Sequence, residues 1–464
     1  MIGKKLEIAR ITQPPTPNPE PRCLSIQTAS TKGGFEAAVL HARRAFLIIM
    51  NNRILWLTEN YPPRRGGMAQ ACDRIVSSLR HNGVIVDVAF FNATAGGFKV
   101  TSQMNGKLIA IPVSDSPAHS LNLLYNYISD PVNKLNYTHV AAFGGTAPML
   151  ALPIYKSWLN LEAVTLLRGN DFDVGVFQPA RRQILFDALN ASDTVCVLHS
   201  EAKHRVSSLL PEANVVCIPN GIDTVEWQND PFDFETAMNF RHENGIADDQ
   251  IVVGLFGQLK EKKGVVFLLE NLLRTGLQEK ITILTVGDIE PAVQAWIDEQ
   301  NGVSIKTGDE GLTCDGSKEQ QIAEQTVEAA EIGNTSNVFE KPHINIVQLP
   351  FKDRFELLSL YPACDFIALP SHYDGMPNVL LEAGALGIPV IGARTGGIFE
   401  VLPEEQHCLT FHPGNADQCR QALNKAAELT ADGRKIIGSA LKKNIEANFN
   451  LAKEAESYKK IFGL

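Results

Sequence analysis

The sequence of residues 251–264 is IVVGLFGQLKEKKG, an apolar run followed by a polar loop with a glycine at each end. The run at 251–256 is short and bounded by polar residues, which is typical of a strand buried on both faces of a sheet. The apolar segment after Gly264 continues as a helical pattern. A strand, a glycine-containing loop and a helix in this order form the repeating unit of a parallel α/β sheet.

The same rhythm extends in both directions along the chain. It begins near Arg53, ends near Ile391, and is interrupted by a polar stretch at 227–250. Two series of strand and helix patterns predict two doubly wound, Rossmann-like domains of the α/β class. The apolar runs interpreted as strands lie at 54–57, 84–90, 140–143, 164–167, 194–198 and 215–218 in the first series, and at 251–256, 281–286, 344–347, 366–369 and 390–391 in the second.

Length and composition agree with this interpretation. A chain of 464 residues exceeds the size of one ordinary core, and 44% hydrophobic with 20% charged residues is typical of a globular protein. The formal net charge of -10 argues against nucleic acid as a partner. No apolar run approaches the roughly 18 residues of a membrane span. We therefore expect a cytoplasmic protein.

The expected organisation has three main parts and two additions. Residues 1–49 are rich in proline and predicted to be a disordered extension; Met50 directly precedes the first strand pattern, which suggests that the native chain starts there. The domains are predicted at 50–224 and 225–444, with an acidic surface insert at about 301–342. The last segment, 445–464, is predicted to be a helix that returns to the N-terminal domain.

In open parallel sheets, ligands bind outside the carboxyl ends of the strands, so the loops there are the candidate site. The loop after the first strand ends in Gly66-Gly67, directly before a helix. Two glycines at a helix N-terminus let backbone N–H groups approach a phosphate, although a plain tight turn would have the same sequence. In the loop at 257–264, Lys263 is a candidate cation for a diphosphate, whereas Lys260 and Lys262 suit a solvated charge run.

A third loop, PSHYDGMPNVLLEAGALG at 370–387, again joins a strand to a helix. Asp374 fits either a ligand contact or a helix cap. Glu382 is the one charged residue between Gly375 and Ala393, so its burial would demand a hydrogen-bonding partner such as a ribose diol. Two weaker signals complete the set: the Gly396-Gly397 turn, and Asn220-Gly221 as a hinge between the two series.

Together these motifs resemble the family-4 group of retaining glycosyltransferases, also called glycosyl transferases group 1, whose fold is named GT-B. The resemblance covers the chain from about Arg53 onward and rests on the ordered combination of all these loops. It implies two facing domains with an interdomain cleft that holds a nucleotide-sugar. It further implies that Lys263 contacts the donor diphosphate, that Glu382 holds the ribose, and that the sugar is faced by Asp374 and the backbone of Gly375, Met376, Pro377 and Asn378.

Three positions depart from the family pattern. Gln258 stands where the family usually has an arginine, so one diphosphate cation is missing or comes from elsewhere. Asp374 is one methylene shorter than the usual glutamate. Where the family often has a histidine that contacts the sugar, this chain reads LRGND at 167–171, and Arg168 is a candidate for the missing cation.

The resemblance implies a glycosyltransferase that retains the anomeric configuration and needs neither a metal ion nor another cofactor. Its partners would be a nucleotide-sugar and a hydroxyl of a glycan, a lipid-linked or a small-molecule acceptor. A peripheral membrane contact through Arg74, Arg80, Arg181 and Arg182 is an alternative to plain solvated helix faces. Three other interpretations stay open: a catalytically degenerate sugar-nucleotide-binding subunit, a phosphorylase, and a metal-dependent enzyme using Asp171-Phe172-Asp173.

Overall fold

The computed structural model describes residues 52–113, 116–169, 171–300 and 343–464. The predicted extension at 1–49 and the predicted insert at 301–342 lie outside the described residues. Residues Asn51–Leu464 form one compact unit, and all contacts below are within it.

The N-terminal domain is built on an eight-stranded sheet with the order β3-β4-β2-β1-β5-β6-β7-β8. Every pair is parallel except β3 with β4, which are antiparallel. The sequence predicted only parallel strands, and it missed three strands of the two sheets. β3 is exposed and polar, with no apolar run to mark it; the short apolar run of β4 was not identified as a strand; and the strand Thr410–Phe411 of the second sheet has only two residues. The strands are β1 (Arg53–Thr58), β2 (Ile85–Asn92), β3 (Lys99–Gln103), β4 (Gly106–Pro112), β5 (His139–Phe143), β6 (Glu162–Leu166), β7 (Thr194–Val197) and β8 (Val215–Cys217).

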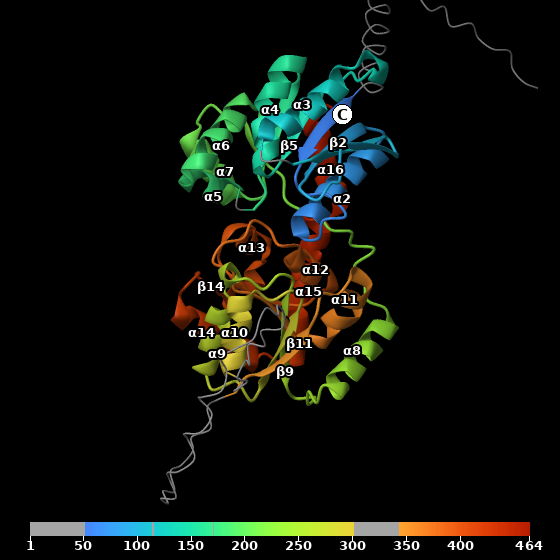
Figure 1. The fold of residues 1–464 in the computed structure, drawn as a ribbon. Helices are drawn as coiled ribbons and strands as arrows, with labels where there is room; N and C mark the ends of the chain where they lie inside the picture. The colour runs from blue at the N-terminus through green and yellow to red at the C-terminus, as the bar shows by residue number, and fades with distance from the viewer. Residues whose placement is uncertain (1–51, 114–115, 170, 301–342) are drawn as a thin grey trace, which may run out of the picture. The chain divides into compact units, whose positions relative to one another are not determined.

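Helices cover both faces of this sheet (Figure 1). Alternate residues of β1 show why, since Ile54 and Trp56 belong to one core cluster and Leu55 and Leu57 to another. A strand buried on both faces has no polar side, as its sequence indicated. The helices are α2 (Gly67–His81), α3 (Pro117–Ser129), α4 (Thr146–Leu159), α5 (Asp171–Phe177), α6 (Pro179–Ala191) and α7 (Ser200–Leu209).

The C-terminal domain has a six-stranded sheet with the order β11-β10-β9-β12-β13-β14, and every pair in it is parallel. Two doubly wound parallel-sheet domains confirm the predicted fold class. The strands are β9 (Ile251–Phe256), β10 (Ile281–Val286), β11 (Asn345–Leu349), β12 (Phe366–Leu369), β13 (Val390–Ala393) and β14 (Thr410–Phe411). The helices are α8 (Pro231–Glu243), α9 (Val265–Leu273), α10 (Pro291–Gln300), α11 (Arg354–Leu360), α12 (Asn378–Leu386), α13 (Gly396–Val401), α14 (Ala416–Glu428) and α15 (Ala431–Asn448).

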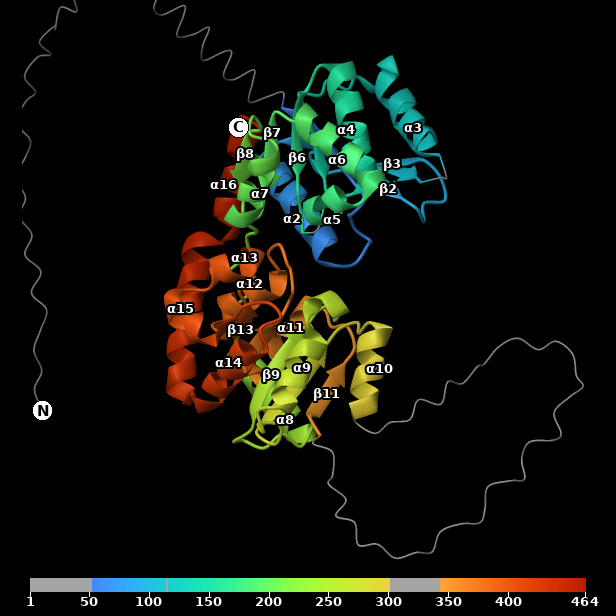
Figure 2. The same cartoon turned by 90° about the vertical axis from the view of Figure 1, so that its left-hand side faces the viewer.

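The last helix, α16 (Leu451–Ile461), lies among elements of the N-terminal domain, while α14 and α15 lie with the C-terminal sheet (Figures 1 and 2). Tyr458 and Phe462 are part of the core beneath β1 and α2. The chain thus passes between the domains twice. The two passages are hydrogen-bonded to each other, because Ile222 N donates to Phe449 O at 2.8 Å and Leu451 N donates to Ile222 O at 3.1 Å.

Candidate active site

A cavity of about 940 Å³ lies at the carboxyl ends of both sheets and is lined by loops of both domains. Gly375 is not on its wall but directly behind it, packed close enough to Gly169 that an added Cβ would be 3.1 Å from the Gly169 Cα. The Gly396-Gly397 turn does not line the cavity either. The residues selected from the sequence that do line it are Gly66, Gly67, Arg168, Asn220, Gly221, Gln258, Lys263, Asp374, Met376, Pro377, Asn378 and Glu382.

Lys263 is positioned by a tight turn between β9 and α9. Gly264 follows it with a φ of +68°, and a Cβ there would be 2.1 Å from the Pro370 carbonyl oxygen, so only glycine fits. The Lys263 ammonium forms an ion pair with the Asp374 carboxylate. Both side chains are partly exposed, at 28% and 17%, so a ligand in the cavity can reach either partner.

Glu382 lies on α12 and lines the cavity. Burial raises its pKa to about 7, while the hydrogen bond from Tyr361 and the charge of Arg74 oppose that shift. The Tyr361 hydroxyl donates to Glu382 Oε2 at 2.7 Å. The required partner of this buried carboxylate is therefore present in the protein, and Tyr361 was not identified from the sequence.

The turn at Gly396-Gly397 supports the loop that carries Asp374. Gly396 has a φ of +47°, and a Cβ there would be 2.1 Å from the Asp374 carbonyl oxygen. Gly397 N donates to the Gly375 carbonyl at 2.6 Å. These contacts fix the backbone of residues 374–375 without using any side chain, so a short glycine pair is needed there.

Two further features of the wall suit an anionic, polar ligand. Gly66 is the N-cap of α2, and no side chain caps this helix end. The first turn of α2 contains no acidic residue, so no negative charge of that turn offsets the backbone N–H groups at the cavity. The Ser371 hydroxyl lines the cavity and is buried without a hydrogen-bond partner in the described structure. A buried hydroxyl without a partner indicates room for a ligand atom.

Gln258 and Arg168 occupy different environments on the wall. Gln258 is exposed in the loop after β9. Arg168 is 3% exposed, and its guanidinium donates to Asn220 Oδ1, donates to Tyr458 OH at 3.0 Å, and lies 5.3 Å from the centre of the Phe143 ring. The guanidinium thus already has three partners inside the protein.

The acidic triplet at 171–173 opens helix α5, and its two carboxylates have separate partners. Asp171 accepts from the backbone N–H groups of Arg168 and Gly145, while Asp173 pairs with Arg205. Burial raises the pKa of Asp171 to about 6. Within the described ranges, no group of three or more His, Cys, Asp or Glu side chains is arranged to hold a metal ion.

The four arginines considered for a basic face do not share one environment. Arg80 is 5% exposed and donates to the Val86 carbonyl, and Arg74 pairs with Glu454. Only Arg181 and Arg182 of the four are exposed. No helix in the described part of the chain is long and apolar enough to cross a bilayer.

The fold is shared with solved structures of other proteins. HepE from Anabaena, solved in complex with UDP, superposes with a TM-score of 0.62 at 15% identity over 89% of this chain and all of that chain. Sucrose-phosphate synthase from Thermosynechococcus elongatus superposes with a TM-score of 0.67 at 15% identity over 89% of this chain and 98% of its own. This architecture is the GT-B fold.

Residues 237–443 match the family model described as glycosyl transferases group 1. The sequence is 24% identical over 274 residues to an uncharacterized glycosyltransferase of Methanocaldococcus jannaschii, a match that spans 58% of this chain and 60% of that protein. It is 23% identical over 406 residues to the GDP-mannose-dependent alpha-(1-6)-phosphatidylinositol monomannoside mannosyltransferase of Mycobacterium tuberculosis, spanning 83% of this chain and 91% of the relative. The chain is thus similar to the group 1 glycosyltransferases over residues 237–443, a little under half of its length.

Proposed function

We propose that the protein transfers a sugar from a nucleoside diphosphate sugar to an acceptor hydroxyl, with retention of the anomeric configuration and without a metal ion. The observation that carries the proposal is the single cavity in which the Lys263 ammonium, the Asp374 carboxylate and the half-buried Glu382 lie together. Each group matches one part of such a donor: the diphosphate, the sugar and the ribose.

The Lys263 and Asp374 pair suggests how the donor is engaged. The ammonium exchanges the carboxylate for a diphosphate oxygen, and the freed Asp374 accepts hydrogen bonds from sugar hydroxyls. Both exchanges depend on the complete donor, because diphosphate without sugar would leave Asp374 without a partner. The pair therefore favours nucleotide-sugars over free nucleotides.

In the reaction, the bond between the anomeric carbon and the diphosphate oxygen breaks, and a bond from the acceptor oxygen forms on the same face. The acceptor proton moves to the departing phosphate oxygen, so no protein nucleophile is required. Lys263 and the backbone N–H groups at the start of α2 stabilise the negative charge that develops on the diphosphate. Contacts of this kind contribute about 3 kcal/mol each.

A second candidate is a binding subunit that has kept the donor cavity and lost turnover. Two observations favour it. Gln258 provides no positive charge, and the Arg168 guanidinium is already bound by Asn220 and Tyr458. If the protein is an enzyme, Lys263 is its main cation for the diphosphate. If it is a binding subunit, it binds the donor but does not transfer the sugar.

A thermal-shift screen against UDP-, GDP- and ADP-sugars, with and without EDTA, tests the donor cavity. We expect one nucleotide class to stabilise the wild type in EDTA, and the shift to be lost in Glu382→Ala. Glu428→Ala is the matched control, because that glutamate is exposed on α14. No shift at millimolar concentration with any donor would contradict the proposal, whereas a shift without sugar transfer to any acceptor would favour the binding subunit.

A further inference from the structure

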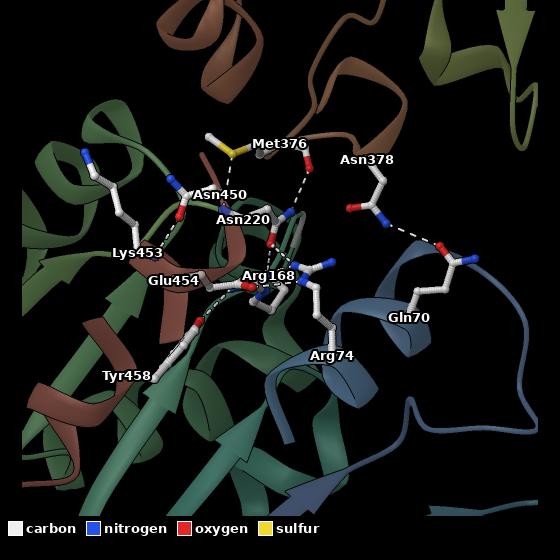
Figure 3. Close-up of polar contacts among 10 residues, drawn as sticks. All are labelled: Gln70, Arg74, Arg168, Asn220, Met376, Asn378, Asn450, Lys453, Glu454 and Tyr458. Atoms are coloured by element: carbon white, nitrogen blue, oxygen red, sulfur yellow. Dashed lines mark hydrogen bonds and ion pairs between the residues drawn. The ribbon is translucent and has the colours of Figure 1, made fainter. Parts of the chain in front are cut away.

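Asn220 lies in the first passage between the domains and is 4% exposed. Its side-chain oxygen accepts hydrogen bonds from two arginines of the N-terminal domain (Figure 3). One comes from Arg74 Nη2 at 3.1 Å and the other from Arg168 Nη2. Two cationic donors converge on this single amide oxygen.

The other half of the same amide contacts the C-terminal domain. Asn220 Nδ2 donates to the Met376 carbonyl at 2.9 Å, and the Asn220 backbone N–H lies 3.3 Å from the Met376 sulfur (Figure 3). Met376 belongs to residues 375–377, here called the donor loop, which lead directly into helix α12. One side chain thus connects the donor loop to both arginines.

The two arginines are themselves held by α16. Arg74 donates from Nε to Glu454 Oε2 at 2.8 Å and from Nη2 to Glu454 Oε1 at 3.0 Å. Arg168 donates to the Tyr458 hydroxyl at 3.0 Å. Glu454 and Tyr458 are 5% and 1% exposed, so the N-terminal side of the link is fixed by buried, charge-assisted hydrogen bonds.

Arg74 belongs to α2, whose N-terminus carries Gly66 and Gly67. The chain of contacts from α2 through Asn220 to Met376 therefore joins the two backbone segments that face the cavity from opposite domains. The same arginine also favours the charged form of Glu382. The Asn220 amide is one of the contacts between these segments, and Asn378 Nδ2 on α12 also donates to Gln70 Oε1 on α2 at 3.3 Å (Figure 3).

We propose that Asn220 is a positioning residue that sets the donor loop relative to α2 for sugar transfer, an inference that rests on the proposed function. An amide is suited to this place because it presents an acceptor to two cations and a donor to a carbonyl. A carboxylate of the same size keeps the first set of contacts but brings a negative oxygen against the Met376 carbonyl. The substitution Asn220→Asp therefore separates the contacts with Arg74 and Arg168, which it keeps, from the contact with the Met376 carbonyl, which it disrupts.

The test is Asn220→Asp in the full chain. We expect a melting temperature at or above that of the wild type, because the carboxylate pairs with both guanidinium groups. Amide hydrogen exchange of residues 376–380 should become faster. With a donor found in the thermal-shift screen, kcat should fall about ten- to a hundredfold, as expected for a displacement of the order of 1 Å, and the share of donor lost to water should rise.

Asn448→Asp is the matched control, because it adds the same charge at an exposed asparagine beside the second passage. It should leave exchange at 376–380 and kcat unchanged. Should Asn220→Asp fail to fold, Glu454→Gln weakens the anchor of Arg74 and is expected to change exchange in the same direction.

Wild-type exchange at 376–380 together with wild-type kcat in Asn220→Asp would overturn the proposal. Failure of the proposed sugar transfer can be distinguished from failure of the proposed role of Asn220. If the wild type neither binds nor uses any nucleotide-sugar, the proposed function fails, while faster exchange at 376–380 in the variant still shows that Asn220 holds the donor loop.

Discussion

The loop at 258–264 and the loop at 167–171 were both expected to bring a cation to the donor diphosphate, and they differ in what surrounds that cation. Lys263 is partly exposed and has one exchangeable partner, the Asp374 carboxylate. Arg168 is 3% exposed and has a hydroxyl, an amide oxygen and an aromatic ring around it. A cation on the wall of a cavity can change partners, whereas a buried cation with a full set of partners holds the fold.

The largest effect is expected for Lys263→Ala, which removes the exchangeable cation. The value of kcat/KM should fall about 10²- to 10³-fold, because a preorganised charge at the leaving group is lost. The melting temperature should change little, since a partly exposed pair contributes about 1 kcal/mol or less. Lys260→Ala in the same loop is the control. Lys260 also lines the cavity, so equal losses in both variants in a transfer assay would remove the distinction between Lys263 and its neighbouring lysine.

Arg168→Ala should act mainly on stability. Truncation leaves the Tyr458 hydroxyl without its buried donor and removes one of the two arginines that donate to the Asn220 oxygen, which costs about 2–4 kcal/mol in the free energy of unfolding. Chemical denaturation measures this loss, and Arg168→Lys should recover part of it. Calorimetry should show donor affinity within about twofold of wild type. A large loss of affinity without a loss of stability would instead make Arg168 the missing diphosphate cation.

Glu382→Gln tests the buried carboxyl by pH. Its pKa of about 7 lies above the usual 4.5, so between these values the folded state holds a proton that the unfolded state has released. The wild-type free energy of unfolding therefore falls as pH rises across this window. Relative to wild type, the variant should gain about 3 kcal/mol between pH 4.5 and pH 8 in urea denaturation. If the free energy of unfolding had the same pH dependence in both proteins, the pKa of Glu382 would not be raised by burial.

Asp374→Asn should release Lys263 from its partner and so separate nucleotide binding from sugar binding. Affinity for a free nucleoside diphosphate should rise about fivefold, which corresponds to an ion pair of about 1 kcal/mol. Transfer from the nucleotide-sugar should fall, because the sugar loses its carboxylate. Asp288→Asn removes the same charge from an exposed residue of the same cavity and serves as the control. Equal gains in calorimetry for both variants would indicate a general charge effect.

Gln258→Arg is expected to give the smallest change. A guanidinium at this exposed position should raise donor affinity about threefold, the size of a solvent-screened contact. The salt dependence of the donor Kd measures it, since a screened contact weakens with ionic strength. An unchanged Kd at low salt would mean that this loop does not reach the diphosphate.

The fold was predictable because it depends on local signals. A strand buried on both faces appears in the sequence as a short apolar run, as β9 does. The loops between strands and helices are marked by glycines, such as Gly264 before α9. The edge strand β3 gave no such signal, since its residues are exposed and only its pairing with β4 makes it a strand. Pairing partners are set by the whole sheet, which a local pattern does not contain.

The site was predictable to the extent that its residues lie in loops at the carboxyl ends of strands. The partners of these residues were not, because they come from distant segments. Tyr361 lies 21 residues from Glu382, and Glu454 lies 380 residues from Arg74. A tyrosine before a proline and a glutamate in a helix have no feature that distinguishes them from ordinary surface residues. Only the packed structure brings them to the carboxylate and the guanidinium that they hold.

The return of α16 to the first domain has a consequence for synthesis on the ribosome. Phe462 is fully buried and lies 6.4 Å from Trp56, measured between ring centres. The core around β1 therefore stays incomplete until residues 458–462 have been translated. While the second domain is being made, the first exposes an apolar groove that its own last helix will fill, and chaperones that bind apolar segments would find their target there.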